Sequence, residues 1–194
     1  MLIKQEFEVT QPLDAVWAFF QDVPSIANCL PGANLTEDLG DDRYGGNVLI
    51  RMGPVKLSFS GTAEIAERDE VNRRIVVDGS GADDKGRGNA VMKVTATLTP
   101  LGPSTRVNII MDLVLSGAAA QYGRGMVADV TAILVGDFVT NMSNRLTALE
   151  KGLDPNSVAA VKPASGLTIG LRAARLALAR VFSRFFLPYA PPAG

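Results

Sequence analysis

The order of the sequence patterns constrains the fold most: a long series of alternating segments is followed by one long helical pattern. Alternation of apolar and polar residues is typical of strands that bury one face. It is present at 3–9 and again in five segments that begin near residues 44, 55, 74, 90 and 107, in a run of about six strands. The connections are short and polar or rich in Gly and Pro, which favours antiparallel neighbours.

Two short helical patterns interrupt the series after its first strand. In the first, Thr10 is expected as the N-cap and Pro12 in the first turn, with an apolar face that includes Phe20. The second covers residues 24–29 and ends at the helix breakers Pro31 and Gly32. We therefore expect two short helices between the first strand and the rest of the sheet.

A single long helix is predicted from about Ala118 to Lys151. One sheet must bury its apolar face, and only this helix is long enough to cover it. The sequence therefore predicts an α+β helix-grip fold, in which a curved antiparallel sheet wraps around the C-terminal helix. We expect residues 1–151 to form a ligand-binding domain, 152–165 a linker, and 166–194 a basic amphipathic tail helix.

Missing residue types exclude several kinds of chemistry. The chain has no histidine and one cysteine, Cys29. It cannot form a triad with histidine, a disulfide within the chain, or a Cys/His metal site. The acid pairs at 41–42 and 83–84 fall in predicted turns, where Asp stabilises the turn and stays solvated. We therefore expect no catalytic residue and no metal, with Cys29 acting as a small buried hydrophobe.

The apolar side of the predicted sheet carries many small residues, namely Gly46, Gly61, Ala63, Gly79, Gly81, Ala90 and Ala96. A core of normal density needs more volume, so we expect a hollow that suits a lipophilic ligand. The alternative is that the glycines only allow coiling and close approach of the helix. The predicted lining is apolar apart from one tyrosine: Phe20, Leu57, Phe59, Met92, Met111, Tyr122, Met126, Val130, Ile133, Leu134 and Phe138.

The first half of the long helix is predicted to be apolar nearly all round. Met126, Val130 and Ile133 continue the line that becomes a polar face, including Asn141, in the second half. Such a surface either contacts the two short helices or forms the mouth of the hollow. Tyr122 lies at this end, where it is either an ordinary interfacial tyrosine or a hydrogen-bond donor to a ligand carbonyl.

The tail is basic and has one apolar stripe. All 20 acidic residues lie at or before Asp154, whereas 163–194 carry four arginines and no acid. Arginines near the middle disfavour spanning a bilayer, so we expect the helix to lie in the membrane interface. A protein partner or the parent domain are the alternatives, and nucleic acid is disfavoured because the arginines are few. The predicted membrane-binding residues are Leu167, Leu171, Arg172, Arg175, Leu178, Arg180, Val181, Phe182, Arg184 and Phe185.

The order of elements resembles the START-like (SRPBCC) helix-grip superfamily. Within it, residues 1–150 resemble the CoxG family of carbon monoxide dehydrogenase. The resemblance is carried by Phe7-Glu8-Val9, Pro12, Val16-Trp17, Leu30-Pro31-Gly32-Ala33, Tyr44, Gly61, and the block from Gly123-Arg124-Gly125 to Phe138.

The resemblance implies a non-catalytic accessory protein of an aerobic, carbon monoxide dehydrogenase-type molybdenum hydroxylase. It also implies a bound respiratory quinone, with menaquinone expected, and recruitment of the enzyme to the inner leaflet of the cytoplasmic membrane. The protein would then be peripheral, on the cytoplasmic face. Two alternatives stay open: a helix-grip enzyme of the polyketide cyclase or hydrolase kind, and a membrane adaptor without a ligand.

Overall fold

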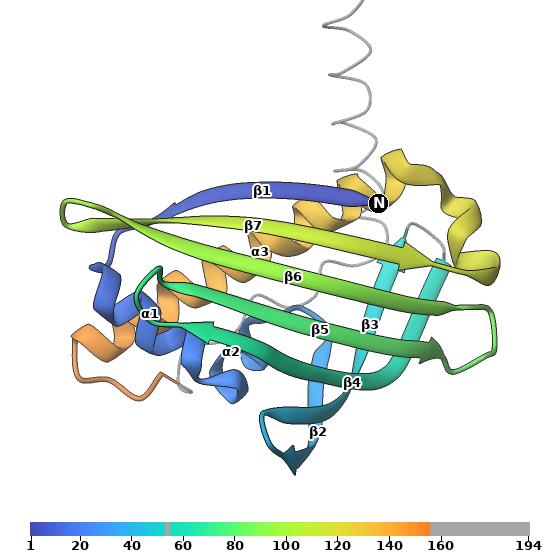
Figure 1. Cartoon of the computed structure of the whole chain (residues 1–194), viewed down its shortest axis with the longest axis horizontal. Helices are drawn as coiled ribbons and strands as arrows, with labels where there is room; N and C mark the ends of the chain where they lie inside the picture. The colour runs from blue at the N-terminus through green and yellow to red at the C-terminus, as the bar shows by residue number, and fades with distance from the viewer. Residues whose placement is uncertain (53–54, 156–194) are drawn as a thin grey trace, which may run out of the picture.

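The computed structural model describes residues 1–52 and 55–155 and shows one antiparallel sheet with three α-helices (Figure 1). The seven strands follow the order β1-β7-β6-β5-β4-β3-β2. The predicted tail and most of the predicted linker lie outside the described residues. The elements are β1 (Leu2–Val9), α1 (Leu13–Gln21), α2 (Val23–Cys29), β2 (Ala33–Gly40), β3 (Arg43–Met52), β4 (Val55–Asp69), β5 (Arg74–Asp83), β6 (Asn89–Leu101), β7 (Ser104–Leu115), the 3-10 helix η1 (Gly117–Tyr122) and α3 (Gly123–Glu150).

The predicted helix grip is confirmed, and the sequence missed one strand, β2. This strand lies at the edge of the sheet and pairs only with β3, with two irregularities in register. Only Ala33 and Leu35 are half-buried, and the rest of the strand is exposed. Because an edge strand that buries so little has no reason to alternate, the period-two signal is absent there.

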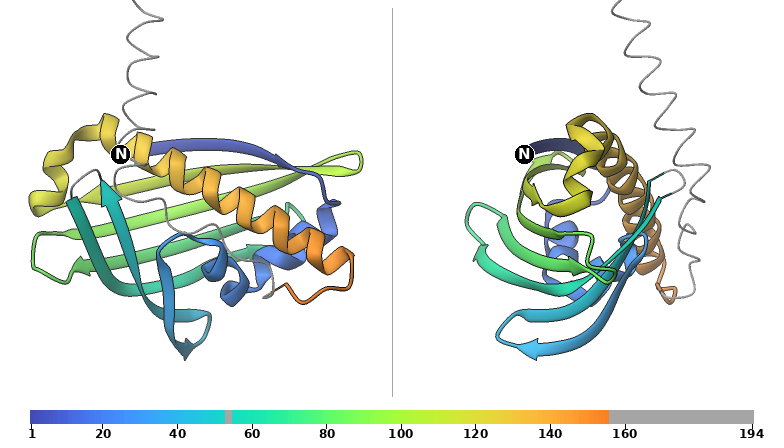
Figure 2. Two further views of the ribbon diagram at one scale, coloured as in Figure 1. Left: turned by 180° about the vertical axis from the view of Figure 1, so that it is seen from behind. Right: turned by 90° about the vertical axis from the view of Figure 1, so that its right-hand side faces the viewer.

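The long helix begins later than predicted. Residues from Gly117 to Tyr122 form a 3-10 helix, and α3 starts at Gly123, whose φ is +74°. A continuous right-handed helix cannot pass through that conformation, which glycine adopts readily. The bend aims α3 diagonally along the inner side of the curved sheet, from η1 toward α1 (Figure 2).

The caps of the two short helices also differ from the prediction. Thr10 is not a cap: Pro12 occupies the N-cap position of α1, and no side chain caps this end. Asp22 caps α2 instead, since its carboxylate accepts a hydrogen bond from the Ser25 backbone N–H at 3.2 Å. This cap begins α2 immediately after α1 and folds the two helices against α3.

Buried apolar side chains form two clusters along the inner face. The larger lies where α1, α2 and the second half of α3 cover the sheet, and it includes Phe20, which packs edge-to-face on Phe138 at 6.4 Å between ring centroids. The smaller joins β4, η1 and the first half of α3 through Leu57, Phe59, Ala119, Val130 and Ile133. We call these the main core and the η1 cluster.

Candidate functional site

The inner face of the sheet changes from closed to partly open along its length. On β6 the inward residues Ala96 and Leu98 are buried, whereas Ala90, Met92 and Val94 nearer η1 are only half-buried. On β7 the inward side likewise changes from buried Val107 to the half-buried set Ile109, Met111, Leu113 and Leu115. The apolar inner face is therefore partly accessible at its η1 end.

The structure divides the predicted lining residues among four places. Leu57, Phe59, Val130 and Ile133 form the η1 cluster, with Tyr122 and Leu134 packed against it. Phe20 and Phe138 belong to the main core instead, so they are filled interior. Met92 and Met111 lie on the same inner face but in neither cluster, and Met126 is 46% exposed on α3. The six residues at the η1 end are thus brought together, and the others are not.

Three of the small residues form a continuous row across the sheet. Gly46 pairs with Gly61, and Gly61 pairs with Gly81. A Cβ at Gly61 would lie 2.0 Å from the Ser80 carbonyl oxygen, so this position must be glycine for the strands to approach and coil. The thioether of Met92 lies over Gly79, where a Cβ would meet its Cε at 2.7 Å. Close packing therefore explains Gly61 and Gly79, and the open inner face rests on the exposure gradient.

The predicted division of α3 into an apolar half and a polar face is wrong at two residues. Asn141 is buried, and its Nδ2 donates to the Cys29 carbonyl oxygen at 3.0 Å, because α2 packs on that side of the helix. Asp129 is 8% exposed within the half predicted to be apolar all round. The thiol of Cys29 is itself buried, and burial raises its pKa to about 11. Cys29 is thus the buried hydrophobe that the sequence predicted.

The structure places a buried ion pair where the sequence predicted a solvated turn acid. Asp83, the last residue of β5, continues the inward side of that strand and pairs with Phe59 on β4. Its side chain is fully buried, in an ion pair with Arg87. Asp83 and Arg87 therefore lie at the η1 end of the inner face.

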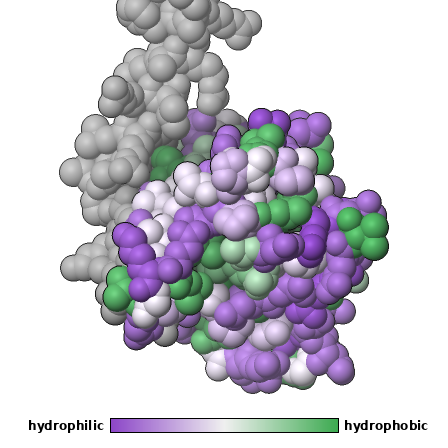
Figure 3. All heavy atoms as spheres, turned by 90° about the vertical axis from the view of Figure 1, so that its left-hand side faces the viewer, coloured by the Kyte–Doolittle hydropathy of each residue, from purple (hydrophilic) through white to green (hydrophobic). Residues whose placement is uncertain are grey.

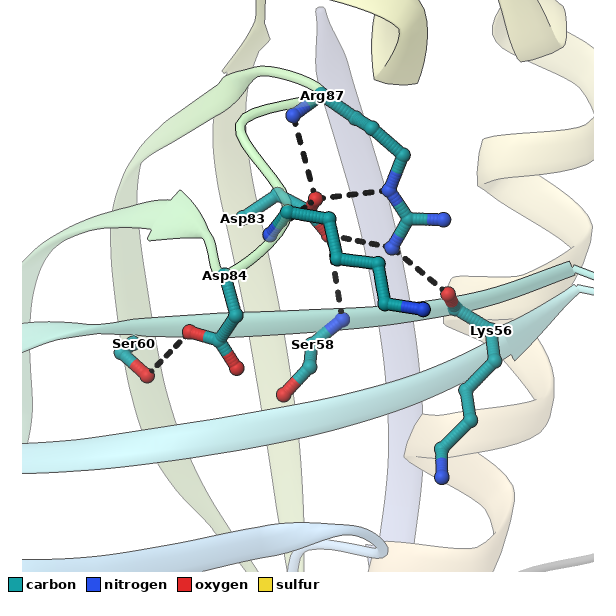
Figure 4. A network of polar contacts seen from close by, with 7 residues as sticks. Lys56, Ser58, Ser60, Asp83, Asp84 and Arg87 are labelled. Carbon is teal, nitrogen blue, oxygen red and sulfur yellow. Dashed lines mark hydrogen bonds and ion pairs between the residues drawn. The ribbon is translucent and has the colours of Figure 1, made fainter.

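Five hydrogen bonds hold the Asp83 carboxylate (Figure 4). It accepts from Arg87 Nη2 at 2.7 Å, Arg87 Nε at 2.8 Å, and the backbone N–H groups of Lys85, Arg87 and Ser58 at 3.0, 3.2 and 3.4 Å. These bonds, foremost the side-chain bonds from Arg87, hold the pKa of Asp83 well below its usual range. Asp83 is a charged anchor, and an anion so well solvated by donors is a weak base.

The neighbouring acids behave as turn residues. Asp84 is exposed, and its carboxylate accepts from the Ser60 hydroxyl at 2.7 Å. Asp41 and Asp42 both have positive φ in the β2–β3 turn, and Asp42 also pairs with Arg68. The turn prediction therefore fails only for Asp83.

The turn that carries Arg87 is fastened to η1. The Arg87 carbonyl oxygen accepts hydrogen bonds from the backbone of Ala118 at 2.7 Å and Ala119 at 3.4 Å. Gly117 has a φ of +67°, and a Cβ there would lie 2.5 Å from the same carbonyl oxygen. Only glycine permits this approach, which fixes Arg87 close to the start of η1.

Residues 117–150 meet the length and hydropathy of a membrane span, with a mean hydropathy of 1.3 over an 18-residue window. The helix nevertheless packs against β1, α1 and α2 as the core helix, and 44% of that window is buried. Hydropathy of this kind is expected of a helix covered on several sides. The opposite, α1 end of the molecule has a mostly hydrophilic surface with scattered hydrophobic groups (Figure 3).

Comparison with known proteins gives a family and a fold. A family model described as the carbon monoxide dehydrogenase subunit CoxG matches residues 6–147. No curated protein sequence matches the chain.

Among solved structures, a conserved protein from Geobacillus kaustophilus is similar with a TM-score of 0.69 at 20% identity, over 76% of this chain and 95% of that one. The Zhui aromatase/cyclase from Streptomyces sp. R1128 is similar with a TM-score of 0.55 at 15% identity, over 76% of this chain and 95% of that one. At such identities the likeness shows a shared helix-grip fold and nothing about activity.

Proposed function

The chain belongs to the CoxG family of carbon monoxide dehydrogenase, and from this premise we propose that it is a non-catalytic accessory protein of a carbon monoxide dehydrogenase-type molybdenum hydroxylase. It binds a respiratory quinone, expected to be menaquinone, on the partly open inner face of its sheet. Its basic tail holds it at the cytoplasmic face of the membrane. The quinone carries the redox chemistry, and the protein supplies binding and orientation.

The partly exposed, apolar inner face at the η1 end supports quinone binding. Ala90, Met92 and Met111 are half-buried there although they face inward. Half-exposed apolar surface inside a fold costs free energy that an apolar ligand can recover, at about 25 cal/mol per Å² of surface removed from water. The face is lined by hydrocarbon and thioether side chains, with Tyr122 packed at its edge. This combination suits a ligand with a long apolar chain and a small polar head.

The test for bound lipid is direct. The full-length chain, purified from cells that make quinones, should release a prenylated quinone on solvent extraction, detected by mass spectrometry at close to one molecule per chain. Extracts that hold no lipophilic molecule, together with a failure to take up menaquinone-4 from micelles, would refute the quinone proposal.

The membrane proposal rests on the sequence of the tail. A chain that lacks 163–194 should no longer float with liposomes that contain anionic lipid, because each basic residue near such a surface contributes about 1 kcal/mol. Glutamine at all four tail arginines should weaken flotation and remove its dependence on salt. Unchanged flotation of the truncated chain would refute membrane anchoring by the tail.

A second candidate, a helix-grip enzyme, is favoured by one observation: an ionisable side chain, Asp83, lies on the inner face. Enzymes of this fold exist, and the Zhui aromatase/cyclase is named as one. A general base should have a pKa near the operating pH, however, and Asp83 is held charged by Arg87. The carboxylate is therefore better suited to positioning Arg87 than to accepting a proton, and the accessory function remains our proposal.

A further inference from the structure

The η1 end of the inner face carries two hydrogen-bond donors that no other described residue uses. Arg87 donates from Nε and Nη2 to Asp83, and Nη2 also donates to the Lys56 carbonyl oxygen at 2.9 Å. Its third nitrogen, Nη1, has no acceptor among residues 1–52 and 55–155. It points away from both Asp83 and the Lys56 carbonyl (Figure 4).

The guanidinium is rigid but accessible. Two of its nitrogens are fixed by a fully buried carboxylate, while the Arg87 side chain is 31% exposed. A planar guanidinium held on one edge presents its remaining edge in a fixed direction. Arg87 therefore resembles a preorganised donor more than a free surface arginine, whose side chain would have to be ordered on binding.

The second donor is the hydroxyl of Tyr122, the last residue of η1. Its ring packs against the η1 cluster, and its hydroxyl has no partner within the described part of the chain. It lies near enough to Arg87 for their electrostatic interaction to contribute to the raised pKa of that guanidinium. The backbone bonds from Ala118 and Ala119 to the Arg87 carbonyl oxygen hold η1 and the turn together. Two unused donors thus border one apolar surface.

We propose that Arg87 Nη1 and the Tyr122 hydroxyl form a polar subsite that binds an acceptor oxygen on the head group of the apolar ligand, with Asp83 positioning Arg87. The subsite rests on the proposed quinone-binding function and specifies its polar end. The ligand class is a lipophilic molecule with a carbonyl or anionic oxygen on a ring. Its hydrocarbon lies along Phe59 and Leu57, and its oxygen meets the two donors.

Two probes with the same ring system test this subsite. Menadione, which is 2-methyl-1,4-naphthoquinone, and 2-methylnaphthalene share their carbon skeleton, but only menadione has acceptor oxygens. Affinities of the full chain for both are measured by equilibrium dialysis. The variants are Arg87→Met and Tyr122→Phe, with Arg106→Met as the control, because Arg106 pairs with Glu6 on the outer face of the sheet.

Wild-type protein should bind menadione more tightly than 2-methylnaphthalene. Each subsite variant should lose about 10-fold or more in menadione affinity, the range expected for a hydrogen bond that involves a charged or buried donor. Its affinity for 2-methylnaphthalene should not change, and Arg106→Met should leave both affinities unchanged. Circular dichroism checks folding. If Arg87→Met does not fold, Arg87→Lys replaces it, since lysine keeps the charge beside Asp83 but lacks the planar third nitrogen.

The outcomes separate the subsite from the function on which it rests. Equal wild-type affinity for the two probes overturns the subsite and leaves the apolar site intact. A folded variant that keeps wild-type menadione affinity overturns the donor role of the residue that it replaces. Failure of wild-type protein to bind either probe overturns the proposed function itself.

Discussion

Two methionines on the same side of the fold should respond very differently to the same substitution. Met142 on α3 is fully buried in the main core, whereas Met92 on β6 is half-buried on the inner face and belongs to neither cluster. Replacing each by alanine removes the same atoms from a filled and from a partly open place. The pair therefore measures how tightly each part of the inner face is packed.

The expected magnitudes follow from burial. Met142→Ala should lower the free energy of unfolding by about 2–5 kcal/mol, because it deletes a buried side chain and leaves a cavity. Full burial of a methionine is worth about 1.5–3 kcal/mol, so Met92→Ala, at half burial and without a new cavity, should cost about 1 kcal/mol. For a domain of this size 1 kcal/mol corresponds to about 2–4 °C in Tm.

The assay is urea unfolding of lipid-free protein, followed by tryptophan fluorescence of Trp17, because a bound ligand would stabilise the folded state and mask the difference. The slope of the free energy against urea should be the same for both variants, which shows that the unfolded states are comparable. Equal losses for Met92→Ala and Met142→Ala would refute the reasoning, since they would show that the inner face at Met92 is closed core.

Three further predictions concern the anchor of the subsite and the one thiol. Because the pKa of Asp83 is lowered in the folded protein, its stabilising contribution is present above the ordinary aspartate pKa and is lost as the pH falls below it; acid titration of unfolding should therefore be less steep for Asp83→Asn than for wild type, and equal slopes would contradict this. Gly117→Ala should destabilise far more than Gly102→Ala, measured by Tm, because both have positive φ but only Gly117 would place a Cβ against the Arg87 carbonyl; equal losses would remove that contact from the account. Cys29, with its pKa raised to about 11, should react with a thiol reagent at pH 8 only on unfolding in urea; rapid labelling of the native protein would show that α2 opens.

The sequence predicts most of the sheet because burial on one side produces alternation. The strands at β3 to β7 and the one long helix are each marked by their period, and together they allow one packing. The signal fails at β2, an exposed edge, where no face is buried. It also fails at the start of α3, because the positive φ of Gly123 depends on how η1 meets the β5–β6 turn.

The site is only partly predictable from the sequence. Residues of the η1 cluster are predicted because they are apolar and have the correct parity along the strands and helix. Asp83 is missed because aspartate in a turn is ordinarily solvated. Its parity, continuing Ile75, Val77, Gly79 and Gly81 along β5, is the available signal. That Asn141 is buried depends on α2 packing against α3, a tertiary contact that no local pattern encodes.

The central claim, that the inner face binds an apolar ligand, is tested most directly by filling that face. Ala90 faces inward, and its neighbour Val91 is 54% exposed on the outer face of the same strand. The measurement is the amount of menaquinone-4 bound per chain by wild type, Ala90→Phe and Val91→Phe, all folded by circular dichroism. We predict that Ala90→Phe abolishes binding and that Val91→Phe binds like wild type; equal binding by both variants would contradict a ligand on the inner face.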